Sequence, residues 1–182
     1  ILKHAIIADK KFFSFLEKNG SRILNLESPL IEKAIFKSCF IKKKVVEIDE
    51  KEKGVRKILN FGHTFAHAYE ATLGYSKKLN HGEAVILGIK TAAKFSLSIN
   101  ILNIKEFNLI ENHLNNLNLP KDINKFFSSI DINKILSFMK KDKKNNTKKI
   151  NLVLLKKIGS PTYKHQFDEK KINLFLRKEL IK

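Results

Sequence analysis

Hydrophobic residues recur at steps of three and four along most of the chain, which is the period of an amphipathic α-helix. On this pattern we predict helices at about 2–18, 29–46, 60–72, 83–98, 103–118, 131–141 and 172–180. Asn19-Gly20 should end the first helix, and Ser28-Pro29 should begin the second, because proline suits the first turn of a helix. The segments 47–57 and 73–82 are polar and contain glycine, so we expect them to be loops.

One segment near the C-terminus has a different pattern. Residues 150–159, INLVLLKKIG, are short, apolar and rich in branched side chains, which is typical of a strand. Gly159 and Pro161 should then turn the chain. The sequence therefore predicts a single, mainly α, multihelical domain over residues 1–182 with a short β element near residues 150–163.

The composition agrees with a packed globular domain, because 43% of the 182 residues are hydrophobic. Cys39 is the only cysteine, so an internal disulfide is excluded and a reducing compartment is favoured. The longest apolar runs, such as AVILGI at 84–89, are far too short to span a bilayer, and no secretory signal pattern is present. We therefore expect a cytoplasmic protein without a membrane partner. The chain begins with Ile1 rather than Met, which suggests a piece of a longer chain.

The formal net charge of +18 raises the possibility of a nucleic-acid partner. Only Arg22, Arg56 and Arg177 are arginines, however, and the other basic residues are lysines. Lysine, asparagine and isoleucine are abundant together, as expected from an AT-rich genome. We therefore predict a solvated lysine surface and no nucleic-acid partner, although the positive field would attract a small anionic substrate. A lysine-rich helical module that binds polyanions is the alternative.

Three histidines carry the strongest chemical signal. His63 and His67 are four residues apart on a predicted helix, so their Cβ atoms should lie about 6 Å apart on one face. His81 stands before a glycine at a predicted helix start, from which its ring could turn toward a neighbouring helix. A catalytic zinc ion needs three protein ligands and an open position. The usual helical zinc motif has a glutamate after its first histidine, where this chain has Thr64, so histidines on a packing face or the surface are the alternative.

Two more polar residues extend this pattern toward the N-terminus. Arg56, Asn60, His63 and His67 follow one another at steps of four, three and four, and they would share one face if the helix begins early enough. Arginine and asparagine are costly to bury without a partner. The stripe therefore either faces a ligand or forms an exposed polar face.

The same stretch resembles the 3-dehydroquinate synthase family. Residues 42–89 contain the family's pattern: KKKVVEIDEKEKGVRKILNFGHTFAHAYEATLGYSKKLNHGEAVILGI. The first 17 residues are similar to a family segment that opens Ala-Glu-(Val/Ile)-(Ile/Leu)-Lys, and residues 140–159 are similar to its Asp-Lys-Lys segment and following strand. The resemblance covers essentially the whole chain and corresponds to the C-terminal, mainly helical half of the family's proteins.

The resemblance implies an enzyme of the shikimate pathway. Members convert 3-deoxy-D-arabino-heptulosonate 7-phosphate to 3-dehydroquinate and phosphate, as carbon–oxygen lyases that use a bound Zn²⁺ or Co²⁺ ion and catalytic NAD⁺. It further implies an N-terminal domain that binds most of the NAD⁺, a homodimeric full-length protein, and an inactive C-terminal fragment. Sibling sugar-phosphate cyclases of the inosose and valiolone type share much of the pattern and remain the alternative.

The resemblance also assigns the metal and catalytic residues. His63 and His81 match two metal ligands, and the third ligand is a glutamate that would immediately precede the chain. His67 and Asn60 match groups near the substrate phosphate, with a role in binding or proton transfer. Lys3 matches a lysine that contacts substrate hydroxyls.

Further residues match the family's substrate-binding groups. Lys42 and Arg56 match the groups that meet the substrate carboxylate, for which the planar fork of arginine is well suited. Lys143, or else Lys144, matches a phosphate ligand, and Lys143 is favoured. The acidic residues of the motif are assigned capping and supporting roles; they are Asp49, Glu50 and Glu52.

Overall fold

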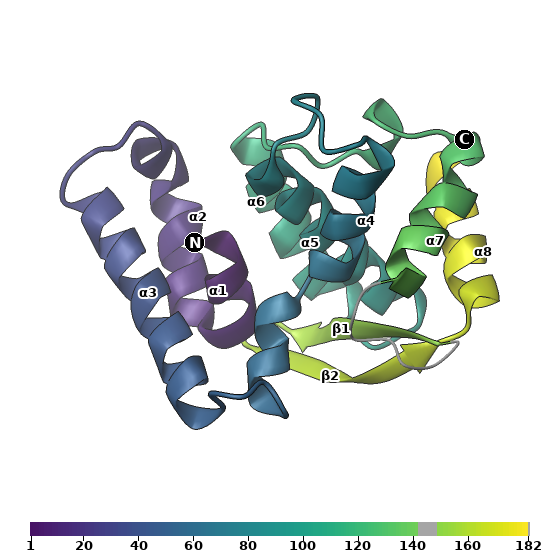
Figure 1. Cartoon of the computed structure of the whole chain (residues 1–182). Helices are drawn as coiled ribbons and strands as arrows, with labels where there is room; N and C mark the ends of the chain where they lie inside the picture. Colours follow the sequence, from purple (N-terminus) through teal and green to yellow (C-terminus); the bar gives the residue numbers. More distant parts are fainter. Residues whose placement is uncertain (142–148, 182) are drawn as a thin grey trace.

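The computed structural model describes residues 1–141 and 149–181 of the chain (Figure 1). The predicted phosphate ligand Lys143 and its alternative Lys144 therefore lie outside the described residues.

The described part of the chain is mainly helical with a short β element near the C-terminus, as predicted, and this element is a β-hairpin. Its α-helices are α1 (Leu2–Ala8), α2 (Lys10–Leu24), α3 (Leu30–Ile48), α4 (His63–Thr72), α5 (His81–Ser98), α6 (Ile104–Asn116), α7 (Ile132–Lys141) and α8 (Glu169–Leu180). Short 3₁₀ helices are η1 (Val55–Asn60), η2 (Ile123–Lys125) and η3 (Ser129–Asp131). The strands β1 (Ile150–Lys157) and β2 (Ser160–Phe167) pair antiparallel, with Ile150 opposite Phe167 and Lys157 opposite Ser160.

The helices predicted at 83–98, 103–118 and 131–141 are confirmed within two residues, whereas the first prediction, 2–18, is right at its start and wrong in its continuity and its end. The predicted single helix is two helices, because the Asp9 carboxylate accepts a hydrogen bond from Phe12 N at 2.9 Å and starts α2. Asn19-Gly20 does not end that helix. A Cβ at Gly20 would lie 2.8 Å from the methyl carbons of Leu117, so this glycine allows close helix packing instead.

The condition for a shared Arg56–His67 face, a helix that begins early enough, is not met. Residues 55–60 form the 3₁₀ helix η1, and Gly62, with φ +80°, separates it from α4. A Cβ at Gly62 would lie 2.6 Å from Ile89 N, and one at Gly88 would lie 2.2 Å from Gly62 O. The close approach of α4 and α5 at these two glycines therefore bends the chain where a continuous helix was expected.

The second strand was not predicted as such, since Pro161 was assigned to a turn. The turn occurs at Gly159, where φ is +84°, and Pro161 lies within β2 opposite Leu155. The strand was missed because its positions are only half-buried or exposed, so it has no continuous apolar run.

Helix α4 packs between α5 and α7, and strand β1 packs against α5. Fully buried aromatic side chains fill the centre of this core; they are Phe13, Phe61, Phe65, Tyr69 and Phe95. In Figure 1, α1–α3 lie on the left and α4–α8 on the right, and the hairpin runs beneath the right-hand group with one end beside α1. The amide of Gly159 donates to Ile6 O at 2.8 Å, which ties the hairpin turn to α1. Within residues 1–141 and 149–181, no helix combines the length and the apolar character that crossing a bilayer requires.

Candidate metal and substrate site

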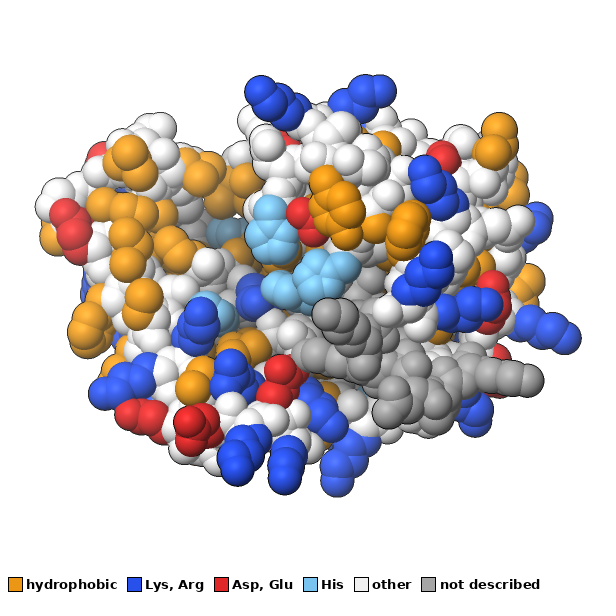
Figure 2. Space-filling model, viewed as in Figure 1, with side chains coloured by type: hydrophobic (Ala, Val, Ile, Leu, Met, Phe, Trp, Pro, Cys, Tyr) orange, Lys and Arg blue, Asp and Glu red, His pale blue; other side chains and the backbone are white. Residues whose placement is uncertain are grey.

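The structure gathers His63, His67 and His81 into a triangle of imidazole rings. The ring centroids are 5.5 Å apart for His63 and His67, 6.2 Å for His63 and His81, and 6.4 Å for His67 and His81. Figure 2 shows histidine side chains clustered near the middle of one face of the molecule. The two predicted metal ligands, His63 and His81, are thus neighbours in space although 18 residues separate them in the chain.

Local structure explains the positions of these three imidazole rings. His63 begins α4 directly after Gly62, and His67 follows one turn later on the same helix. His81 begins α5, whose start is fixed by a capping box in which Asn80 N donates to the Glu83 carboxylate at 2.9 Å.

Lys3 contacts the His63 ring of this triangle. Its Nζ lies 3.2 Å from His63 Nε2. Burial, followed by the charge of Lys3, lowers the pKa of His63 to about 4, so the ring is neutral at pH 7. Burial and the neighbouring Lys42 lower the pKa of Lys3 to about 8, which leaves its ammonium mostly charged. An ammonium only donates, so His63 Nε2 accepts and Nδ1 carries the proton, facing Phe61 O at 3.3 Å.

His81 has an equivalent partner on its Nδ1 atom. The carboxylate of Glu70 places Oε1 at 3.0 Å and Oε2 at 3.2 Å from this nitrogen. Both predicted ligand rings therefore have Nδ1 next to a protein acceptor, which directs each Nε2 lone pair away from that acceptor; the lone pair of His63 accepts a hydrogen bond from Lys3. Imidazole nitrogens of this kind suit Zn²⁺ and Co²⁺.

The two predicted ligands, His63 and His81, do not complete a metal site. Among the described residues, no group of three or more His, Cys, Asp or Glu side chains is arranged to hold a metal ion. A metal bound by His63 and His81 therefore needs a further donor from outside these residues.

Two cavities meet at His63. Cavity A, of about 710 Å³, lies between α1, α3 and α5, and its wall includes Lys3, His4, Lys42, His63 and His81. It thus contains four of the predicted site residues. His4 was not predicted; its Nδ1 is 2.7 Å from the Ser38 hydroxyl.

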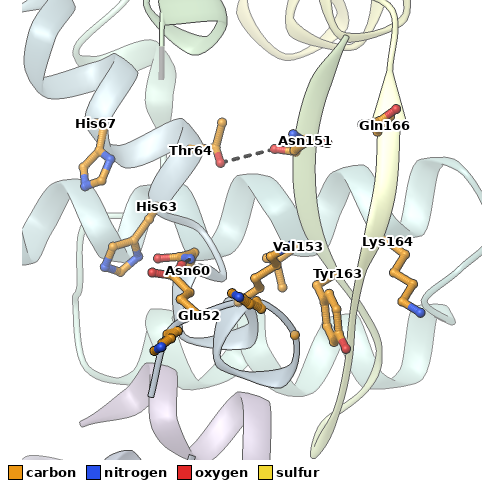
Figure 3. Close-up of a pocket in the computed structure, with 14 residues that line it drawn as sticks. Glu52, Asn60, His63, Thr64, His67, Asn151, Val153, Tyr163, Lys164 and Gln166 are labelled. Atoms are coloured by element: carbon orange, nitrogen blue, oxygen red, sulfur yellow. Dashed lines mark hydrogen bonds between the residues drawn. The ribbon is translucent and has the colours of Figure 1, made fainter. Parts of the chain in front are cut away.

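Cavity B, of about 790 Å³, lies between η1, α4 and the hairpin (Figure 3). Asn60, His63 and His67 form one side of it, and Tyr163 and Lys164 from β2 form the other. Among residues 1–141 and 149–181, the lysines that line the cavity are Lys51, Lys53, Lys57 and Lys164. This basic and polar wall is suited to a phosphate group.

The acidic residues between α3 and η1 shape the near wall of cavity B. Desolvation of the Asp49 carboxyl group raises its pKa. The backbone N–H groups of Arg56, Gly54 and Lys53 donate to this carboxylate, and they hold its pKa below the usual value. This is the capping role predicted for Asp49. Asn60 Nδ2 donates to the Glu52 carboxylate at 2.5 Å, so Glu52 supports a predicted site residue.

Arg56 does not join the other predicted substrate ligands. Its Nη1 donates to Glu50 O at 2.5 Å, and it lines neither cavity within the part of the chain that the structure describes. Lys42, its predicted partner on the substrate carboxylate, lies in the wall of cavity A.

Sequence reasoning missed Glu70 and the hairpin side of cavity B. Glu70 had a signal, because His63, His67 and Glu70 follow one another at steps of four and three, which places them on one face of α4. Asn151, Lys164 and Gln166 had none, because only strand pairing brings them to the histidines.

Residues 1–145 match the family model for the C-terminal domain of 3-dehydroquinate synthase. The chain belongs to this family. It is 73% identical over all of its 182 residues to a 3-dehydroquinate synthase of Pelagibacter ubique (strain HTCC1062), of which it covers 50%. It is 41% identical over 159 residues to that of Thermoanaerobacter pseudethanolicus (strain ATCC 33223 / 39E), with 87% of this chain and 43% of the relative covered. The chain thus spans about half the length of the curated 3-dehydroquinate synthases that it matches.

Solved structures of related cyclases share the fold of this 3-dehydroquinate synthase domain. A 2-epi-5-epi-valiolone synthase from Streptomyces hygroscopicus subsp. jinggangensis 5008, with NAD⁺ and Zn²⁺ bound, matches with a TM-score of 0.81 at 18% identity, over 97% of this chain and 48% of that one. A 2-deoxy-scyllo-inosose synthase complexed with carbaglucose-6-phosphate, NAD⁺ and Co²⁺ matches with a TM-score of 0.76 at 24% identity, over 98% and 50%. At these identities the match establishes the fold alone.

Proposed function

We propose that the full-length protein is a 3-dehydroquinate synthase, a phosphate-eliminating lyase. Its substrate is 3-deoxy-D-arabino-heptulosonate 7-phosphate, and its products are 3-dehydroquinate and inorganic phosphate. The observation that carries this proposal is the 73% identity over the entire chain to a relative of that name. A sibling cyclase is less well supported, since the inosose and valiolone synthases are only 24% and 18% identical.

His63 and His81 would hold a divalent zinc or cobalt ion. Three features of the structure support this: the 6.2 Å ring separation, the acceptors at both Nδ1 atoms, and the neutral state of His63. The third ligand is proposed to be a glutamate of the preceding segment. When bound, the ion would polarise a substrate hydroxyl, and NAD⁺, held mainly by an N-terminal domain, would accept and return a hydride.

The chain's own residues would bind and orient the substrate in cavity A. Lys3, whose ammonium lies next to His63, would donate to substrate hydroxyls near the metal. Lys42 would pair with the substrate carboxylate from the wall of the same cavity. Arg56 is proposed as the second carboxylate ligand, which requires its side chain to leave Glu50 O when substrate binds.

Cavity B would receive the phosphate end of the substrate. Asn60 and His67 line it beside His63, and four lysines supply positive charge to its wall. His67 is exposed to solvent, so it could exchange a proton with the phosphate or its surroundings during elimination. Lys143 is proposed as a further phosphate ligand from outside the described residues.

The remaining predictions concern the whole protein. We propose that it acts in the shikimate pathway, in the cytoplasm, as a homodimer that needs its N-terminal NAD⁺-binding domain for activity. No nucleic-acid or membrane partner is expected, since the lysine charge is assigned to solvation and to the anionic substrate.

The test is an assay of the full-length protein with NAD⁺ and Zn²⁺. Phosphate release and 3-dehydroquinate formation are measured with the carboxylate-bearing heptulosonate phosphate, and with hexose and heptulose phosphates that lack the carboxylate. We expect turnover of the first substrate only, and a raised KM for it in Lys42→Met. Turnover of a carboxylate-free sugar phosphate alone would assign the protein to the sibling cyclases.

A further inference from the structure

We propose that Glu70 is a positioning residue for the metal site: it holds the imidazole of His81 in the tautomer and orientation that present Nε2 to the ion. This inference rests on the proposed function, because it concerns the metal that His63 and His81 would bind. The cluster of Glu70 and His81 joins the end of α4 to the start of α5.

The contact geometry identifies the tautomer. Both carboxylate oxygens of Glu70 lie within hydrogen-bond distance of one atom, His81 Nδ1, at 3.0 Å and 3.2 Å. A carboxylate accepts hydrogen bonds, so Nδ1 must carry a proton and donate it. In the neutral ring, Nε2 then has no proton and its lone pair is free for a metal.

The exposure of the Glu70 and His81 side chains shows why the hydrogen bond between them matters. The His81 side chain is 64% exposed, whereas that of Glu70 is only 12% exposed. An exposed ring on the first residue of a helix has few neighbours that limit its rotation. Within the described residues, His81 is the side chain that hydrogen-bonds the Glu70 carboxylate, so the partly buried acid anchors the exposed ring.

The position of Glu70 on its helix is unfavourable without such a partner. It lies in the last turn of α4, where the helix dipole disfavours a negative charge. It is also largely withdrawn from water, which adds a desolvation cost. A carboxylate at this place is therefore best explained by what it does for His81.

His63 has the same arrangement with a weaker acceptor. Its Nδ1 faces the Phe61 carbonyl at 3.3 Å, while its Nε2 accepts from Lys3. Both rings are thus oriented through Nδ1, but only His81 has a charged acceptor at that atom. A carboxylate partner makes the imidazole a more basic ligand than a carbonyl does, so we expect His81 to depend more on its partner.

The test compares metal affinity in the full-length protein and its variants. Zn²⁺ is titrated into metal-free wild type, Glu70→Gln and Glu70→Ala against a competing chelator, and the visible absorption of the Co²⁺-loaded forms is recorded. We expect Glu70→Ala to bind Zn²⁺ about 10- to 100-fold more weakly, with altered Co²⁺ bands. Glu70→Gln keeps an acceptor but loses the charge, so its loss should be smaller yet measurable.

The matched control is Glu179→Ala. The Glu179 side chain is 18% exposed, pairs with Lys94 at 2.7 Å and, within the described residues, lines neither cavity A nor cavity B, so its removal deletes a carboxylate of similar burial outside the site. This variant should keep wild-type Zn²⁺ affinity and Co²⁺ absorption even if its melting temperature falls.

The outcomes separate the two proposals. If wild type binds one Zn²⁺ ion and Glu70→Ala matches it in affinity and Co²⁺ spectrum, the role of Glu70 is refuted while the proposed function stands. If Glu70→Ala does not fold, the same comparison with Glu70→Gln decides, and an unchanged affinity and spectrum would refute the role. If wild type binds no Zn²⁺, the metal assignment and the role of Glu70 both fail.

Discussion

The two cavities that meet at His63 are built in different ways. Cavity A is walled mainly by helices, and His63 and His81 lie at helix starts that a glycine and a capping box define. Cavity B is walled by a 3₁₀ helix, the first turns of α4, a polar loop and the β-hairpin. Its lysines come from segments that are more than 100 residues apart in the chain, as Lys57 and Lys164 illustrate.

The difference shows that the two parts of the site need different geometric precision. The atoms of the proposed metal ligands need positions accurate to a few tenths of an ångström, and helix ends braced by buried side chains supply such positions. Binding a phosphate by several lysines tolerates looser geometry, because charge attraction is not directional. We therefore expect substitutions in cavity A to remove function and substitutions in cavity B to tune it.

The largest effect should come from the two proposed metal ligands in cavity A. His63→Ala or His81→Ala in the full-length protein should abolish binding of about one Zn²⁺ ion and lower kcat by about 1,000-fold or more, since the metal supplies several kcal/mol. Metal content is measured by atomic emission and turnover by phosphate release. His165→Ala, on β2 and outside the walls of both cavities as described, is the control and should keep its zinc. Full metal content in His81→Ala would remove this residue from the ligand set.

The next effect concerns the close approach that holds α4 against α5. Gly62→Ala should lower the free energy of unfolding by about 2–4 kcal/mol, because φ is +80° and a Cβ would meet Ile89 N at 2.6 Å. Denaturant unfolding followed by circular dichroism measures this change. Gly82→Ala is the control, since a Cβ there meets nothing within 4 Å. Equal stability of the two variants would show that the α4–α5 contact can relax.

A smaller effect distinguishes the two proposed carboxylate ligands. Arg56→Lys should lower kcat/KM by about tenfold, or about 1.4 kcal/mol, because a point charge cannot replace a planar fork. Lys42→Arg keeps a charge in the wall of cavity A and serves as the comparison. Near-normal kinetics in Arg56→Lys would mean that Arg56 only braces the Glu50 backbone, as its present hydrogen bond does.

The smallest effect is a pH dependence of stability in the metal-free protein. Burial, followed by nearby positive charges, lowers the pKa of His4 to about 4 from an ordinary value of 6.5. The unfolded chain then binds more protons than the folded one below pH 6.5, so the free energy of unfolding should fall as pH decreases from 6.5 to 4. His4→Asn should show a shallower fall in urea unfolding across this range. An identical slope in both proteins would mean that His4 does not contribute.

Much of the helical framework was predictable, and the reason is local. The α5, α6 and α7 segments carry a clear period of three to four residues, and such a period depends only on near neighbours. The prediction errors occurred where a contact between residues far apart in the sequence decides the local structure. Gly20 was taken as a helix end but packs against Leu117, and the helix expected at residue 60 begins only at His63, after the Gly62–Gly88 approach.

The sequence by itself determined the family, the chemical types in the site and the pairing of His63 with His67 along one helix, because motif and spacing are properties of the chain. The family motif already paired His81 with His63, but only the tertiary structure decided that His81 lies against Glu70 and that β2 closes the basic cavity. These contacts join segments 11 to about 100 residues apart. Packing of the whole core sets such distances, and no local pattern encodes them.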